Sequence, residues 1–298
     1  MTNNLNELLD NPNKKMNSEE LALLSSVFRK DIWDVLHQRG TGHWGGSASC
    51  AELITSLYFN RLNIDPKKPN KEDRDKFVLS KGHASINLYT VLANRGFFPT
   101  KDLPTFRTLG SYLQGHPCMS KIPGVDMSTG ALGHGISVGL GMALSAQLLD
   151  NGSSTYVMTG EGCLNEGQSW EALMMAGKYK PKNLILMIDY NKVQLDGTMD
   201  EIMPLHHLRE RLSSFGWHVN STPYDGNNTN DILSSFQWMD SDDIWPKAVI
   251  YDTIKGKGVS FTEGKNTWHG KVIDDDSYAK GLIELDKDIK NKGDKVWA

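Results

Sequence analysis

Short apolar runs alternate with longer segments of helical periodicity along most of the chain. Apolar residues at helical spacing predict helices, and short apolar runs with β-branched residues predict buried strands. The predicted helices cover residues 21–39, 50–62, 136–149, 166–179, 201–215 and 229–239, and the predicted strands cover 77–80, 154–158, 184–188, 217–219 and 248–254. Strands that alternate with helices are typical of an α/β fold, here a mostly parallel sheet sandwiched by helices.

Local signals predict where several elements begin and end. Asn17 and Glu20 have the spacing of a capping box, which predicts the start of the first helix, and Gly40 predicts its end. Residues 41–46 are rich in glycine, so we expect a loop there rather than a helix. The three aspartates at 274–276 are expected to cap a terminal helix and not to bind a metal.

The stretch 159–167, with the sequence Thr-Gly-Glu-Gly-Cys-Leu-Asn-Glu-Gly, lies between a predicted strand and a predicted helix. In a parallel sheet, ligands bind where the carboxyl ends of the strands face one crevice. Gly160 and Gly162 let the backbone approach a phosphate, and the following helix N-terminus favours an anion. Glu161 and, after the next strand, Asn191 each bring an oxygen to this crevice. Because Mg²⁺ prefers a few protein oxygens together with phosphate oxygens, the pattern suggests a diphosphate held through a metal.

An ordinary glycine-rich turn before a core helix is the alternative interpretation, and Asn191 is the residue that favours the metal site. A Rossmann dehydrogenase is not favoured, because the Gly-x-Gly pattern lacks the third glycine and the acidic ribose ligand.

Composition narrows the function classes and the domain organisation. The 298 residues can bury a sizeable core, and we expect a loosely ordered tail over 1–16 and one domain over 17–298, since no repeat or linker divides them. The net charge of −4 without a basic stripe argues against nucleic-acid binding, and no apolar run is long enough for a membrane anchor. Three scattered cysteines predict neither a zinc site nor a disulfide framework, which fits a reducing cytoplasm.

Motifs from about residue 20 to residue 275 resemble those of the transketolases in sequence and in order. The Gly-Glu-Gly turn with the later asparagine is similar to the thiamine-diphosphate motif of that family. The matching motifs are 41–43, 80–85, 114–117, 128–135, 160–162 with Asn191, 196–197, 215–219 and 268–271.

This resemblance implies two cofactors, thiamine diphosphate and Mg²⁺, with Ca²⁺ or Mn²⁺ as alternative ions. It implies metal ligands at Glu161, Asn191 and the carbonyl of Val193. It places the cofactor against His83, Gly130, Leu132, His134, Gly160, Gly162 and Glu166, where Glu166 would support the metal loop or an interface.

The resemblance also implies a reaction, in which a two-carbon ketol unit moves from a ketose phosphate to an aldose phosphate. His43, His116 and His269 are then expected to contact substrate hydroxyls or to assist proton transfer, for which imidazole is suited near neutral pH.

Two positions depart from the family pattern. Glu161 stands where transketolases normally have aspartate, and its extra methylene moves the carboxylate out by about 1 Å, whereas Mg²⁺ tolerates little distortion. We expect a shifted loop, a lower metal affinity or a larger ion. His134 stands where glutamine is more often found.

The chain ends where the diphosphate-binding domain of transketolases ends, and no segment resembles the pyrimidine-binding domain with its catalytic glutamate. We therefore expect an N-terminal subunit that is inactive alone and joins a separate C-terminal transketolase subunit, with pyrimidine-binding and C-terminal domains, in an α₂β₂ assembly acting on small sugars. The alternatives are a ketol or acyloin transferase subunit of specialised metabolism and a non-catalytic scaffold.

Overall fold

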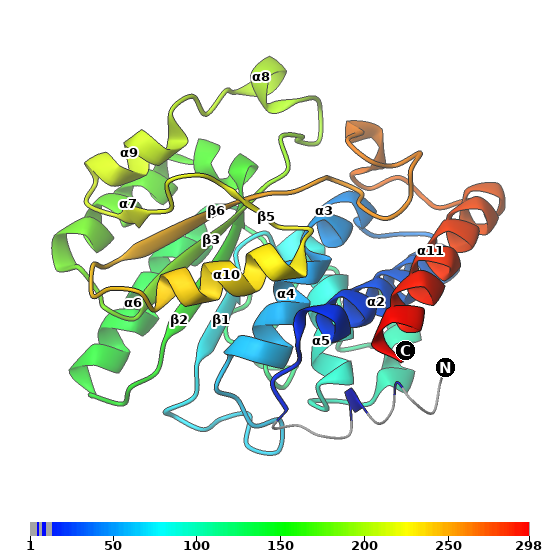
Figure 1. The fold of residues 1–298 in the computed structure, drawn as a ribbon, viewed down its shortest axis with the longest axis horizontal. Helices are drawn as coiled ribbons and strands as arrows, with labels where there is room; N and C mark the ends of the chain where they lie inside the picture. Colours follow the sequence, from blue (N-terminus) through cyan, green and yellow to red (C-terminus); the bar gives the residue numbers. More distant parts are fainter. Residues whose placement is uncertain (1–4, 6–7, 10–13, 298) are drawn as a thin grey trace.

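Six parallel strands form the centre of the molecule, with helices on both faces (Figure 1). The computed structural model describes residues 5, 8–9 and 14–297. The strand order is β1-β2-β3-β6-β4, and β5 also pairs with β6. The strands are β1 (Lys76–Leu79), β2 (Thr155–Gly160), β3 (Leu184–Tyr190), β4 (His218–Val219), β5 (Tyr224–Asp225) and β6 (Lys247–Asp252). The predicted α/β fold with a mostly parallel sheet is confirmed.

The register of the sheet brings the ends of β2 and β3 together. Gly160, the last residue of β2, pairs with Asp189 near the end of β3, and Asp189 pairs in turn with Tyr251 of β6. The residues that follow these strands, Glu161 and Asn191, therefore emerge at the same edge of the sheet.

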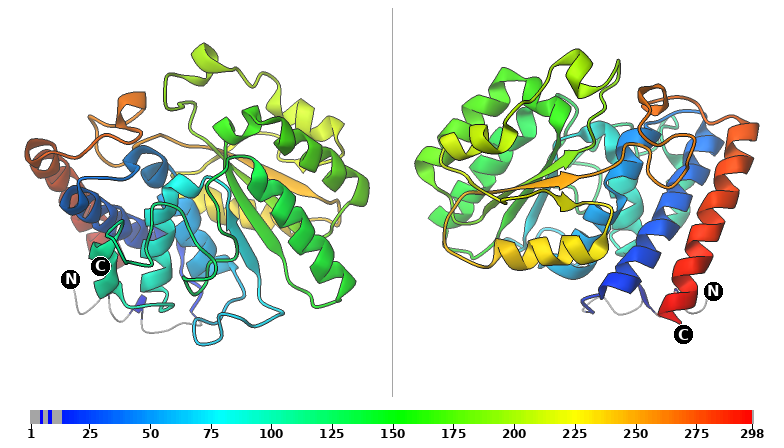
Figure 2. Two further views of the ribbon diagram at one scale, coloured as in Figure 1. Left: turned by 180° about the vertical axis from the view of Figure 1, so that it is seen from behind. Right: turned by 45° about the horizontal axis from the view of Figure 1, so that its top comes forward.

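Alternate side chains of the strands enter two hydrophobic cores, because successive strand residues point to opposite faces. Met158 and Met187 join the larger core, whereas Val157 and Leu186 join the smaller one. Figures 1 and 2 show α6 and α7 on one face of the sheet and α2, α4 (Ala51–Ser56), α5 and α10 on the other, with α11 lying along α2. The larger helices are α2 (Ser18–Arg39), α5 (Ser85–Asn94), α6 (His134–Leu148), α7 (Gly167–Tyr179), α10 (Thr229–Met239) and α11 (Asp275–Val296).

The predicted helix boundaries of α2 and α11 are confirmed. Asn17 and Glu20 form the capping box of α2, and Gly40 ends this helix in the left-handed conformation with a φ of 61°. Asp274 caps α11 by accepting a hydrogen bond from the backbone N–H of Ser277. The two helices pack closely, since a Cβ on Gly281 would lie 2.7 Å from the ring of Trp33.

The expectation that residues 41–46 form only a loop was wrong, because α3 spans Trp44–Ser49. Trp44 is fully buried against Trp33, with ring centroids 4.6 Å apart, and this packing overrides the low helix propensity of glycine. Glycine at position 46 lets the backbone of α3 lie close to the His83 ring, since a Cβ there would be 3.1 Å from His83 Nε2. The helix predicted next, over 50–62, is present as α4 (Ala51–Ser56) and a π-helix, η1 (Leu57–Arg61).

The prediction of a single helix over residues 201–215 was also wrong. The structure has two short helices there, α8 (Met199–Ile202) and α9 (Leu208–Ser214). Pro204 lies between them, and proline has no backbone N–H with which to continue a helix.

The tail predicted over 1–16 lies largely outside the described residues. Among those described, Leu8 and Met16 are buried, and Met16 donates its backbone N–H to the carbonyl of Phe59. Within the described part of the chain, no helix combines the length and the apolar character needed to cross a membrane. Short 3₁₀-helices complete the fold at η2 (Gly82–Ala84), η3 (Thr100–Thr105), η4 (Glu161–Asn165) and η5 (Asn266–Trp268).

Candidate active site

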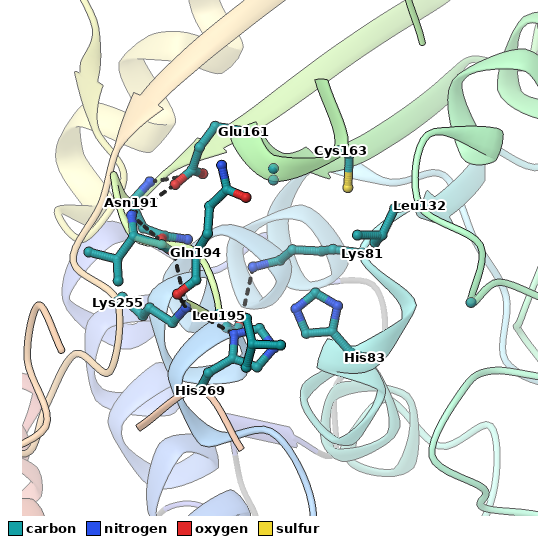
Figure 3. Close-up of a pocket in the computed structure, with 15 residues that line it drawn as sticks. Lys81, His83, Leu132, Glu161, Cys163, Asn191, Gln194, Leu195, Lys255 and His269 are labelled. Carbon is teal, nitrogen blue, oxygen red and sulfur yellow. Dashed lines mark hydrogen bonds between the residues drawn. The ribbon is translucent and has the colours of Figure 1, made fainter. Parts of the chain in front are cut away.

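A cavity of about 280 Å³ lies at the edge of the sheet where β2 and β3 end (Figure 3). Its lining includes most of the residues predicted from the sequence to form the site. These are His83, Gly130, Leu132, Gly160, Glu161, Gly162, Asn191, Val193 and His269. The structure thus brings together segments that lie far apart in the chain.

Glu161 is the first residue after β2, and its carboxylate is buried with 2% of its surface exposed. Its two oxygens accept hydrogen bonds from the backbone N–H groups of Asn191, at 3.3 Å, and Val193, at 3.1 Å. Lys192 between them has a φ of 65°, the left-handed conformation that lets both N–H groups turn toward one carboxylate. Burial, aided by the charge of Asp189, raises the pKa of Glu161 to about 7.

The three predicted metal ligands belong to one small loop. The side-chain oxygen of Asn191 lies 3.3 Å from the backbone nitrogen of Val193, which donates to it. The carbonyl oxygen of Val193 accepts a hydrogen bond from Lys255 Nζ at 2.9 Å, and so does that of Gln194 at 2.8 Å. A carboxylate, an amide oxygen and a carbonyl oxygen are the hard donors that Mg²⁺ or Ca²⁺ prefers.

A buried ion pair between Lys81 and Asp189 supports the loop of Asn191 and Val193. Asp189 is fully buried and bonds to Lys81 and to the hydroxyls of Ser49 and Thr253. Burial alone would raise the pKa of Asp189, but the charge and hydrogen bond of Lys81 outweigh it and hold the pKa below its ordinary value. Asn191 Nδ2 donates to the same carboxylate at 3.3 Å, so the ion pair also orients the metal loop.

Three histidines from separate elements meet beside the cavity. His43 precedes α3, His83 lies in η2 and His269 follows η5, and their ring centroids are 5.1–5.3 Å apart. Burial lowers the pKa of His43 to about 4, that of His269 to about 3, and that of His83 well below 6.5. Nearby cations act in the same direction, so all three rings are neutral at pH 7.

Four of the predicted residues do not line the cavity. His43 is next to it through the histidine cluster, and His116 lies against Gly130, where a Cβ would be 3.5 Å from its ring. His134 begins α6 and Glu166 precedes α7, and both side chains are exposed.

Other lining residues were not selected from the sequence. These are Gly46, Lys81, Cys163, Gln194, Leu195 and Lys255. The sequence contains a pattern that indicates Lys255 as a site residue. It follows the predicted buried strand at 248–254 in a Lys-Gly-Lys-Gly turn, and ligands bind at this end of a parallel strand. Its contacts with Val193 and His269, at positions far away in the sequence, could not be predicted.

The chemistry of this cavity suits an anionic ligand that carries a divalent ion. Burial lowers the pKa of the Lys255 ammonium to about 8, while the charge of Glu161 opposes this. No hydrogen-bond partner in the described part of the protein occupies the ring nitrogens of His83. Among the described residues, no three His, Cys, Asp or Glu side chains are grouped so that they could hold a metal ion.

Comparison with known proteins gives consistent matches over most of the chain. Residues 22–288 match the family model of the transketolase, thiamine diphosphate binding domain. One of the subunits of apulose-4-phosphate transketolase from Phocaeicola vulgatus is 39% identical over 275 residues, which cover 92% of this chain and 97% of that protein. Subunit SqwG of 6-deoxy-6-sulfo-D-fructose transketolase from Clostridium sp. is 40% identical over 90% of this chain and 97% of that protein.

Solved structures of transketolases share the fold but are longer. Transketolase from Campylobacter jejuni superposes with a TM-score of 0.84 and 29% identity over 91% of this chain. Transketolase from Leishmania mexicana gives a TM-score of 0.80 and 26% identity over 95% of this chain. The chain spans only 43% and 46% of those two proteins.

Proposed function

This chain belongs to the transketolase family, as its thiamine diphosphate binding domain, and we propose that it is the N-terminal subunit of a two-component transketolase. The enzyme would transfer a two-carbon ketol unit from a ketose phosphate to an aldose phosphate. Relatives that match over nearly their whole length are named as subunits of transketolases, which supports a division of the enzyme between two chains.

One observation carries the proposal. Glu161, Asn191 and the carbonyl of Val193 converge at the adjoining ends of β2 and β3, on the wall of a cavity that His83 and His269 also line. The Glu161 carboxylate accepts two backbone N–H groups, yet burial still raises its pKa to about 7, so a bound divalent cation would stabilise its charged form. We assign these three residues as ligands of Mg²⁺, or of Ca²⁺ or Mn²⁺.

The residues present fit thiamine diphosphate. Gly160 and Gly162 leave the cavity wall without side chains, and Gly130 and Leu132 form another part of the lining. Lys255 provides a positive charge, and the neutral His83 ring has one N–H that can donate to a phosphate oxygen. We assign His134 and Glu166 to the surroundings of this site, where Glu166 would support the metal loop or the partner interface.

Bound thiamine diphosphate supplies the carbon nucleophile that accepts and releases the ketol unit. The residues of this chain bind the substrate, orient it and move protons. His43 and His269 are neutral at pH 7, so each ring carries a single N–H that it can donate to a substrate oxygen. His116, beside Gly130, is placed to contact the substrate from another side of the site. The buried pair of Lys81 and Asp189 keeps the loop of Asn191 rigid during this chemistry.

The partner is a C-terminal transketolase subunit that contributes the pyrimidine-binding and C-terminal domains, and we propose an α₂β₂ assembly. Its support is the naming of two relatives as transketolase subunits, since this chain matches 97% of the length of each. We place the enzyme in the cytoplasm, since Cys50 and Cys163 are free thiols buried in the protein.

Isothermal titration of thiamine diphosphate with Mg²⁺ into the co-purified pair of subunits tests this function. The wild-type pair is expected to bind the cofactor in a Mg²⁺-dependent manner. Glu161→Ala is expected to abolish binding, because the metal then loses its only charged protein ligand.

Glu72→Ala serves as the matched control, because Glu72 is exposed and remote from the cavity. It should bind the cofactor like the wild type. Undiminished binding by Glu161→Ala would reject the assigned ligand role, and a wild-type pair that binds no cofactor would favour a scaffold function.

A further inference from the structure

Arg107 directs its guanidinium at one ring nitrogen of His43. Its Nη2 lies 3.3 Å from His43 Nδ1, and its Nη1 donates to the hydroxyl of Thr41 at 2.8 Å. A guanidinium has only donors and stays charged at any accessible pH. His43 Nδ1 must therefore accept the hydrogen bond, and it carries no proton.

Arg107 is held in one position at a cost in free energy. Its backbone has a φ of 56°, a left-handed conformation that is strained for a residue with a side chain, and Leu113 holds it through a hydrogen bond of 2.8 Å. Arg107 Nε is buried without a hydrogen-bond partner among the described residues. Gly115 makes room for the guanidinium, since a Cβ there would lie 2.6–2.9 Å from its atoms. Strain and an unpaired donor that persist together at one residue point to function rather than to stability.

The other edge of the His43 ring faces the histidine cluster. A Cβ on Gly270 would lie 3.5 Å from His43 Cδ2 and 3.8 Å from Nε2, and the rings of His83 and His269 are both 5.3 Å away. The nitrogen on this edge is therefore the one that a ligand beside the cluster would meet.

We propose that Arg107 is a positioning residue that fixes His43 as the tautomer with its proton on Nε2, so that His43 offers an N–H donor to a substrate oxygen. The neutral ring can hold that single proton on either nitrogen, and the guanidinium excludes it from Nδ1. The opposite tautomer would place an N–H against the guanidinium and would leave only an acceptor on the substrate side. The use of the Nε2–H group toward a substrate rests on the proposed function. The tautomer of His43 depends only on contacts within this chain.

Long-range ¹H–¹⁵N NMR of the full chain, labelled with ¹⁵N-histidine, reads the tautomer directly. The His43 signals are assigned from the pair that disappears in His43→Gln. In the wild type, Nδ1 is expected at the position of an unprotonated ring nitrogen and Nε2 at that of a protonated one. In Arg107→Met the two signals are expected to shift toward each other, as the tautomers mix, and Arg107→Lys should keep more of the Nε2–H form.

A second variant reaches the same contact without changing the arginine. Gly115→Ala displaces the guanidinium and should also mix the tautomers, whereas Gly141→Ala, where a Cβ meets nothing within 4 Å, should leave His43 unchanged. The signals of His269, which Lys255 contacts, should not move in either Arg107→Met or Gly115→Ala. A wild-type His43 with its proton on Nδ1, or unchanged signals in both variants, would overturn the proposal. Because the spectra need neither cofactor nor partner, they give an answer even if thiamine diphosphate does not bind.

Discussion

The resemblance to transketolases implies an aspartate at the position of Glu161, and glutamate has one methylene more. The carboxylate reaches into the loop and accepts both backbone N–H groups, from Asn191 and Val193. Lys192, between the two donors, has a left-handed conformation with a φ of 65°. A shifted loop, a lower metal affinity and a larger ion all stay predictions for this residue.

The buried histidines give the protein a defined response to acid. His269 has a pKa of about 3 in the folded protein against an ordinary value of 6.5, because of burial and of nearby Lys255. The unfolded chain therefore binds a proton on this ring below pH 6.5, whereas the folded chain does not until about pH 3. The stability that this group contributes is present above pH 6.5 and is lost as the pH falls toward 3.

His269→Gln should make this loss shallower, because glutamine does not titrate. Thermal unfolding of both proteins from about pH 7 to about pH 4 measures the effect, and the difference in melting temperature between wild type and variant should narrow as the pH falls. A difference that stays constant over this range would contradict the low pKa of His269.

At the scale of elements, the sequence predicted the parts of the fold that depend on neighbouring residues. Apolar runs identified every strand except the two-residue β5, and the capping box of Asn17 and Glu20 identified the start of α2. The Gly-Glu-Gly turn and Asn191 were predicted to share a site because parallel strands end at one edge of the sheet, and the register of Gly160 with Asp189 shows why.

Elements that depend on distant contacts could not be predicted in this way. Helix α3 exists because Trp44 packs on Trp33, and glycine content alone pointed to a loop. The contacts of Arg107 and Lys255 with His43, His269 and Val193 could not be predicted either, because no local pattern reveals them.

Helix α7 offers a test of close packing between elements. A Cβ on Gly177 would lie 1.6 Å from the backbone oxygen of Phe215, an atom that cannot move without moving the end of α9. Alanine is favoured over glycine in a helix by about 1 kcal/mol, but overpacking costs about 1–3 kcal/mol or more. Since the clash is with backbone, Gly177→Ala should destabilise the protein by about 2 kcal/mol or more.

Chemical denaturation measures this change, with Gly141→Ala in α6 as the matched control, because a Cβ there meets no atom within 4 Å. The control should be neutral or more stable than wild type by up to about 1 kcal/mol. If Gly177→Ala stabilised the protein as much as the control does, the close contact between α7 and the Phe215 backbone would be contradicted.

At the scale of the whole molecule, we propose that the chain forms one side of an active site that a second subunit completes. The cavity contains the proposed metal ligands, Lys255 and neutral histidines, and the resemblance to transketolases implies that the glutamate that activates the cofactor lies in another domain. The purified chain alone should therefore show no ketol transfer, and activity should appear on mixing with the C-terminal subunit. Coupled assays of the mixture and of the two separate chains measure this, and turnover by the chain alone would contradict a divided site.

The most direct measurement is a crystal structure of the two-subunit complex with thiamine diphosphate and Mn²⁺, whose anomalous signal locates the ion. We predict the ion between the Glu161 carboxylate, the Asn191 side-chain oxygen and the Val193 carbonyl, in contact with the cofactor's diphosphate. A diphosphate bound elsewhere, or an ion that touches none of these three residues, would contradict the account.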